Sequence, residues 1–280
     1  MTDGPPRIFD AHAQALHRAR AARRTGERFL LSEAAEGIAA RLAPVNRRFA
    51  KALDIEGSAA GLLPDAAWHR GGFDADGRLE TGEGGFDLVV SILSLHGLND
   101  LPGALVQIRR ALKPDGLFVG ALLGGATLFE LREAFAAGEI ETLGGVTPRV
   151  APFADLRELG ALLQRAGFAL PVADVERTTV HYRDFATLSG DLRGMGETNA
   201  LAERSRTLSR ATLKAALAHY AANHAEPDGR LRATFDIVYL TGWAPHESQP
   251  LPLRPGSAKA RLAEALGTSE HCAGDKATPR

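Results

Sequence analysis

The sequence predicts an α/β fold in which helices cover both faces of a doubly wound, mostly parallel sheet. Residues 86–91 and 117–123 are nearly continuous apolar runs, as expected for strands that are covered on both faces. Between them, residues 101–112 repeat their apolar side chains at helical spacing. A strand, a helix and a second parallel strand form a right-handed βαβ unit. We therefore expect a binding site at the carboxyl ends of these two strands.

Helices and strands alternate along the rest of the chain. Two N-terminal helices are predicted over residues 7–30 and 32–42, with Ser32 as the cap of the second. A short strand is predicted at 49–55, and the Gly-rich stretch 64–85 predicts loop with one short strand near 66–70. Further helices are predicted at 128–135 (with Thr127 as cap), 155–166, 185–192 and 209–223, and further strands at 172–182 and 233–242. The last of these strands is expected at an edge of the sheet.

This pattern predicts three segments. Residues 1–48 form an N-terminal helical segment, and residues 49–243 form the α/β domain. Within that domain, residues 183–228 are a helical insertion before the last strand, which we expect to cap the site. The Pro- and Gly-rich residues 244–280 are expected to form a flexible tail.

Composition excludes several classes of protein. The 280 residues are 45% hydrophobic and carry a formal net charge of −1, which permits a sizeable core and does not favour nucleic acid. The single cysteine, Cys272, excludes an internal disulfide framework and a Cys-rich zinc site. No apolar run reaches the roughly 20 residues that a membrane span requires. The Arg-rich stretch 18–28 superficially resembles a transit peptide, but it continues into a further helix, so we interpret it as a solvated helix.

Three short words carry a resemblance to class I S-adenosylmethionine (SAM) methyltransferases, which have a Rossmann-like sheet. They are 52–57 (ALDIEG), 86–91 (FDLVVS) and 112–116 (LKPDG). More specific words look like those of the methyltransferase-like assembly factors of respiratory complex I: 91–96, 99–102, 124–128, 152–153, 191–199 (DLRGMGETN), 242–243 and 246–249 (HESQ). The similarity extends over about residues 7–258. The malonyl-carrier-protein methyltransferase of biotin synthesis is a more distant relative.

This resemblance implies a SAM-dependent methyltransferase-family protein that acts on a protein substrate, a complex I subunit, during assembly of NADH dehydrogenase. The mitochondrial family members are described as hydroxylating an arginine of such a subunit rather than methylating it. The implied setting is cytoplasmic, at the inner face of the respiratory membrane and without stable insertion into it.

The sequence departs from its family at the cofactor turn. The family has Asp-x-Gly-x-Gly-x-Gly, whereas here Asp54 is followed by Glu56 in place of the first glycine, and only Gly57 and Gly61 remain. The segment from Asp54 to Phe86 is shorter than in the family by about one βα unit. Two hypotheses follow: SAM binds through an altered turn, or the fold persists as a cofactor-free pseudoenzyme or assembly chaperone.

The resemblance and the strand ends together give the candidate site residues. Those expected to bind the cofactor are Asp54, Glu56, Gly57, Gly61, Ser91, Ile92 and Leu93. His96 is the candidate catalytic base, with a structural hydrogen-bonding role as its alternative. Those expected to contact the substrate are Asn99, Thr127, Glu130, Met195, Glu197, Asn199 and His246. Asp74 and Asp76 are the candidates for the acid that holds the ribose. His246 and Glu247 alone make a weak pair of ligands, so we expect no metal.

Overall fold

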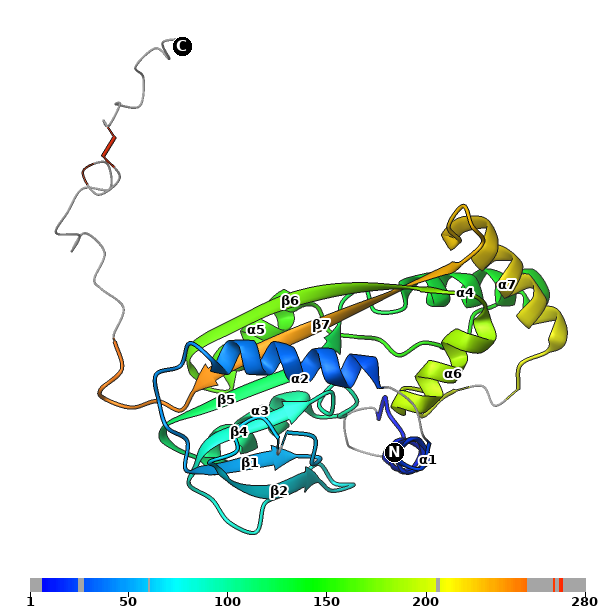
Figure 1. Cartoon of the computed structure of the whole chain (residues 1–280). Coiled ribbons are helices and arrows are strands. Elements are labelled where there is room, and N and C mark those ends of the chain that lie inside the picture. Colours follow the sequence, from blue (N-terminus) through cyan, green and yellow to red (C-terminus); the bar gives the residue numbers. More distant parts are fainter. Residues whose placement is uncertain are drawn as a thin grey trace. The chain divides into compact units, whose positions relative to one another are not determined.

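The structure is a computed structural model that describes residues 7–24, 28–59, 61–204, 207–250, 264, 267 and 268. Contacts along the backbone divide the chain into two units, Met1–His246 and Glu247–Arg280. All the helices and strands named below belong to the first unit (Figure 1). Cys272 lies outside the described residues.

Seven strands form one sheet in the order β3-β2-β1-β4-β5-β7-β6. They are β1 (Lys51–Ile55), β2 (Ala67–Phe73), β3 (Leu79–Glu80), β4 (Phe86–Ile92), β5 (Leu112–Gly124), β6 (Ala169–Tyr182) and β7 (Leu231–Trp243). Strands β1, β2, β4 and β5 are parallel to one another, while β3 and β7 run against their neighbours. The predicted mostly parallel α/β sheet is confirmed.

Helices cover both faces of this sheet because side chains of successive strand residues point to opposite faces. Along β5, Leu117, Val119 and Ala121 pack in one core, while Phe118 and Leu122 pack in the other. The helices are α1 (Ala11–Ala22), α2 (Phe29–Leu42), α3 (Leu101–Ala111), α4 (Phe129–Leu143), α5 (Leu156–Arg165), α6 (Phe185–Met195) and α7 (Arg210–His224). The first core receives α2, α4, α6 and α7, and the second receives α3 and α5. Figure 1 shows α4, α6 and α7 grouped at one end of the sheet.

Side-chain caps start several of the helices. The carboxylate of Asp155 accepts from the backbone N–H of Glu158 in a complete capping box, and Ser209 caps α7. Two predicted caps are wrong. Ser32 lies inside α2, which begins at Phe29, and α4 follows Leu128 rather than Thr127. The Thr127 hydroxyl is engaged instead in hydrogen bonds to the carbonyls of Gly124 and Asp236.

The shortened segment lies between β1 and β4. It still contributes two strands, and β2 extends farther than the predicted 66–70. Among the described residues of 56–85, however, no helix connects these strands. The parallel strands β1 and β2 are therefore joined through turns rather than through a described helix.

The prediction that the last strand lies at an edge of the sheet is wrong. Strand β7 lies between β5 and β6, with Leu240 opposite Gly120 on one side and Ala173 on the other. Nearly all its residues are buried, which fits a strand with two neighbours and a covered face. The long β6 takes the edge position instead. Composition alone did not reveal this, because neighbours across a sheet are set by topology rather than by the local pattern.

Candidate functional site

Two cavities open at the carboxyl ends of the central strands. The smaller has a volume of about 200 Å³ and is lined by Ser58 after β1 and by Ile92 and Leu93 at the end of β4. The larger has a volume of about 540 Å³. Arg18 and Glu197 line both, so these two side chains lie between the cavities. Sites for small molecules usually span roughly 300–1,000 Å³, a range that only the larger cavity reaches.

The turn after β1 is organised by Asp54. This carboxylate is buried and accepts from the backbone N–H groups of Ser58, at 3.0 Å, and Ala59, at 2.7 Å. Burial raises the pKa of Asp54, and the hydrogen bonds from the turn, including one from Gly57, oppose that shift only in part. The turn therefore keeps the acidic residue and the backbone cradle that the sequence predicts.

The rest of the turn is filled by side chains of this chain. Glu56 stands in the left-handed region with φ of +72°, and its carboxylate lies 3.5 Å from the guanidinium of Arg18. The guanidinium of Arg70 from β2 covers Gly57 and donates to its carbonyl at 3.4 Å. It occupies the space that a glycine at this position leaves for a ligand. Gly61, by contrast, has no neighbour within 4 Å of the position of a Cβ.

Ser91, at the end of β4, and the candidate ribose-binding acids Asp74 and Asp76 have partners within the protein. The Ser91 hydroxyl is buried and lies 2.6 Å from that of Ser94, so it serves the strand end rather than a ligand. Asp74 accepts from the backbone of Asp76 and Arg78 in the β2–β3 turn, and neither aspartate lines a described cavity. The turn thus keeps Asp54 and Gly57, while the exposed guanidinium of Arg70 covers Gly57 and neither candidate ribose aspartate lines a described cavity.

His96 and Glu197 form a pair between the two cavities. The Nε2 atom of His96 lies 3.0 Å from Oε2 of Glu197, and the side chains are 8% and 22% exposed. The backbone N–H of Leu123 approaches Nδ1 of His96 at 3.5 Å, so both ring nitrogens have a polar neighbour. Burial opposes ionisation of Glu197, but His96 and the more distant Arg18 outweigh it and hold the pKa of Glu197 below its usual range. With both ring nitrogens engaged, the geometry favours a positioning role for His96.

Three of the predicted substrate residues have structural partners. Asn99 binds both backbone groups of Phe9 and so holds the start of the described chain against the β4 loop. Thr127 is fully buried against β7. Glu130 is also fully buried and accepts from the hydroxyl and backbone N–H of Thr234. Among the described lining residues, none of these three appears in either cavity.

The other predicted substrate residues divide between the cavities and the surface. Met195 lines the small cavity, Asn199 lines the large one, and Glu197 lines both. The Nδ2 atom of Asn199 also donates to the carbonyl of Pro148. His246 is exposed, at the end of the first unit, and lines neither cavity.

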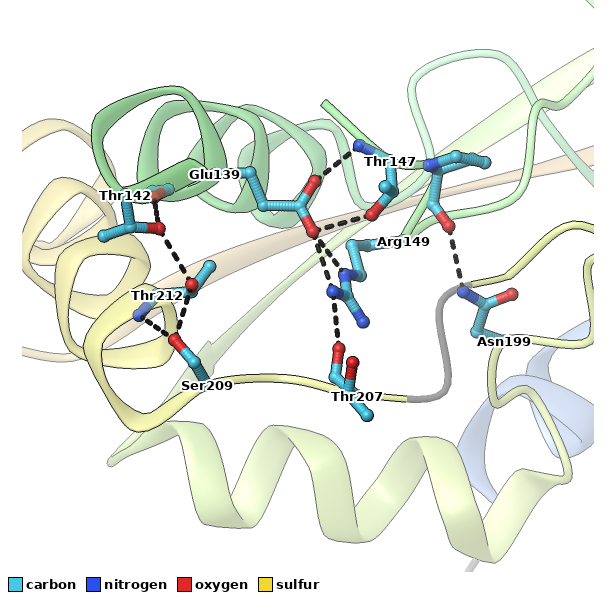
Figure 2. Close-up of polar contacts among 10 residues, drawn as sticks. Glu139, Thr142, Thr147, Arg149, Asn199, Thr207, Ser209 and Thr212 are labelled. Atoms are coloured by element: carbon cyan, nitrogen blue, oxygen red, sulfur yellow. Dashed lines mark hydrogen bonds and ion pairs between the residues drawn. The ribbon is translucent and has the colours of Figure 1, made fainter. Parts of the chain in front are cut away.

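Residues that the sequence did not single out make most of the polar wall of the large cavity. These are Arg18 from α1, Arg193 from α6, and Arg149 and Arg204 from loops. Figure 2 shows how Arg149 is held: its guanidinium lies 2.8 Å from the buried carboxylate of Glu139, which also binds Thr147. The spacing of these residues along the chain gave no signal of the site, because four separate segments supply the four arginines.

No described helix is both long and apolar enough for a membrane span. Within the described residues, no group of three or more His, Cys, Asp or Glu side chains is placed to hold a metal ion.

Comparison with known proteins identifies the family of this chain. A family model for the methyltransferase domain matches residues 7–171. The chain belongs to the methyltransferase family. Among solved structures, the YcgJ protein of Bacillus subtilis is similar to the present chain. The similarity covers 75% of the present chain, with a TM-score of 0.49 and 13% identity.

Sequence relatives carry two activities in their names. The mitochondrial arginine-hydroxylase NDUFAF5 of Danio rerio is 45% identical to this chain over 182 residues, and that of Homo sapiens is 47% identical over 182 residues. Each match covers 65% of this chain. A malonyl-[acyl-carrier protein] O-methyltransferase of Laribacter hongkongensis is 40% identical over 169 residues, which is 60% of this chain. The matches cover 57%, 53% and 54% of those relatives, so the chain spans about half their length.

Proposed function

We propose that this methyltransferase-family chain binds a protein substrate, a subunit of respiratory complex I, in its large cavity and acts in assembly without holding SAM. The observation that carries this proposal is the contrast between the two ends of the cleft. Arg70 covers the glycine turn, whereas a cavity of about 540 Å³ stays open beside it. The short words that resemble those of complex I assembly factors, and the identity of 45–47% to arginine hydroxylases over 65% of the chain, support the assembly pathway.

Titration calorimetry tests the cofactor part of this proposal. We expect no heat of binding from SAM or S-adenosylhomocysteine at millimolar concentration. A measurable heat would overturn the cofactor-free reading.

Two matched variants test the cavity part. Ser58→Trp places a large side chain in the small cavity and Ala151→Trp places one in the large cavity. In a strain that depends on this chain, we expect Ser58→Trp to support complex I assembly and Ala151→Trp to abolish it, as seen on native gels of the membranes. The reverse pattern would contradict the proposal, provided that both variants unfold at wild-type temperature.

A second candidate function is SAM-dependent methyl transfer to the same protein substrate. One observation favours it: Asp54 still organises the turn through backbone N–H groups, as a working pocket requires. Under this alternative, SAM would bind in calorimetry and Ser58→Trp would abolish both binding and assembly. The two experiments above therefore separate the two functions.

A further inference from the structure

The polar wall of the large cavity is mainly cationic. Four arginines line it, and Glu197 is the acidic residue among its described lining residues. That carboxylate is already engaged by His96 at 3.0 Å. The floor is apolar and includes side chains such as Leu131, Phe135 and Phe235. The cavity thus presents guanidinium groups above an apolar surface.

Three of these arginines have an acidic partner that does not line the large cavity, and one of these pairs is Arg18 with Glu56, at 3.5 Å. Glu139 binds Arg149 and is fully buried, and Asp10 binds Arg204 at 3.0 Å. Neither acid is among the lining residues. These pairs fix the positions of the guanidinium groups, so the arginines do not have to be ordered when a ligand arrives.

Arg193 differs from the other three arginines. Its Nη1 atom donates to the carbonyl of Ser189 at 3.3 Å and to the hydroxyl of Ser189 at 3.1 Å, and both are uncharged groups. The side chain stands on the last turn of α6, at the rim of the cavity. A carboxylate at this rim would form a charge-assisted pair, which is the strongest type of hydrogen bond that a guanidinium forms.

We propose that the large cavity takes an acidic peptide segment, with a carboxylate at Arg193 and an adjacent apolar side chain on the floor. This inference rests on the proposed binding of a protein substrate in that cavity. A lysine or arginine side chain at this position would instead be repelled by the guanidinium of Arg193.

Fluorescence polarisation with labelled, end-capped peptides tests the assignment on the full chain. The peptides are Gly-Phe-Glu-Leu-Gly and the same sequence with Gln or Lys in place of Glu. We expect the Glu peptide to bind roughly fivefold or more tightly than the Gln peptide, the Lys peptide to bind most weakly, and added salt to weaken the Glu complex. Equal binding of the Glu and Lys peptides overturns the assignment.

A charge-reversal variant tests whether the carboxylate of the peptide binds at Arg193. Arg193→Glu is expected to remove the preference for the Glu peptide, while the matched change Arg165→Glu, at an exposed position on α5 outside the cavity, leaves it intact. An unchanged preference in Arg193→Glu overturns the placement at the rim.

Decanoate serves as a free carboxylate, and tighter binding of decanoate than of the Glu peptide overturns the assignment to a peptide. Complex I assembly that needs Ala151 despite equal peptide binding would leave the proposed function standing while this inference fails.

Discussion

At the scale of single residues, Glu139 is the group on which the wall of the large cavity depends. Its carboxylate accepts from the backbone and hydroxyl of Thr147 and from the guanidinium of Arg149 (Figure 2). Glu139→Gln keeps the shape of the side chain but removes the negative charge that faces the guanidinium of Arg149, which is 12% exposed. We expect a loss of about 3 kcal/mol in the free energy of unfolding, measured in urea. Glu141→Gln, at an exposed position of the same helix, is the control and should change stability little.

The pH dependence of this effect follows from the sign of the shift. Burial opposes ionisation of Glu139, but Thr147 and Arg149 outweigh it and hold its pKa below the usual range. A lowered pKa in the folded state stabilises the protein above the unfolded pKa of about 4.3, and that stability is lost as pH falls through the folded value. The difference between wild type and Glu139→Gln should therefore shrink at acidic pH. A constant difference from neutral pH down to acid would show that the charge of Glu139 is not what stabilises the loop.

Glu56 offers a second test at this scale. Its φ of +72° is a conformation that glycine adopts freely and other residues adopt at a cost. Glu56→Gly should raise the free energy of unfolding by up to about 1 kcal/mol, because the relief of backbone strain exceeds the loss of a half-exposed ion pair with Arg18. Glu80→Gly, in the regular strand β3, should instead lower stability. Equal destabilisation by both changes would contradict the strained turn.

At the scale of elements, the packing of α4 against α7 depends on Gly138. A Cβ at this position would lie 2.6 Å from the backbone nitrogen and 2.9 Å from the Cα atom of Ala216, and neither atom has room to move. Helix propensity alone favours Gly138→Ala by roughly 1 kcal/mol. We expect the steric conflict to win and to lower the melting temperature, with a net cost of about 1–3 kcal/mol.

Gly190 supplies the control for that experiment. It lies inside α6 with nothing within 4 Å of its Cβ position, so Gly190→Ala should gain the propensity without a clash. The two changes are chemically identical and should shift the melting temperature in opposite directions. A stabilised Gly138→Ala variant would mean that α4 and α7 separate at little cost.

Elements were predictable from sequence where the signal is local. The apolar period predicted α3 and α5, and the structure adds the acids that cap them, Asp100 and Asp155. Helix α4 continues eight residues beyond its predicted end at Phe135. The sequence did not predict this extension, because the outward face of the helix is also partly apolar, with Ile140 and Leu143 exposed. Helical ends of this kind are set by tertiary partners such as α7, which a local pattern does not contain.

At the scale of the whole molecule, the candidate site was predictable in its location but not in its composition. Strand ends identified the edge of the sheet, and Asp54 and Glu197 were found there. The pairing of Glu197 with His96 joins residues 101 positions apart. Arg18 was expected on a solvated helix, yet it lines both cavities, because α1 packs beside α6. A charge that lines a cavity and a charge that faces solvent look alike in a single sequence.

The position of β7 yields a prediction about the molecule as a unit. This strand pairs with β5 through residues 117–124 and with β6 through residues 169–182. A chain that ends at Arg230 lacks it, and both neighbours lose a long hydrogen-bonding partner. We expect that chain to lose cooperative unfolding and near-UV circular dichroism. A cooperative transition near the temperature of the full chain would show that β5 and β6 hold together without β7.

The late position of β7 in the sequence also affects the risk of aggregation during synthesis. Because β7 follows all other strands in the sequence, β5 and β6 leave the ribosome before their shared partner exists. For that interval each exposes a free edge, and open edges of this length invite pairing with other chains. The nascent protein thus passes through a stage in which two strand edges that are internal in the finished sheet can pair with other chains. Synthesis of residues 231–243 ends that stage by converting both edges into sheet interior.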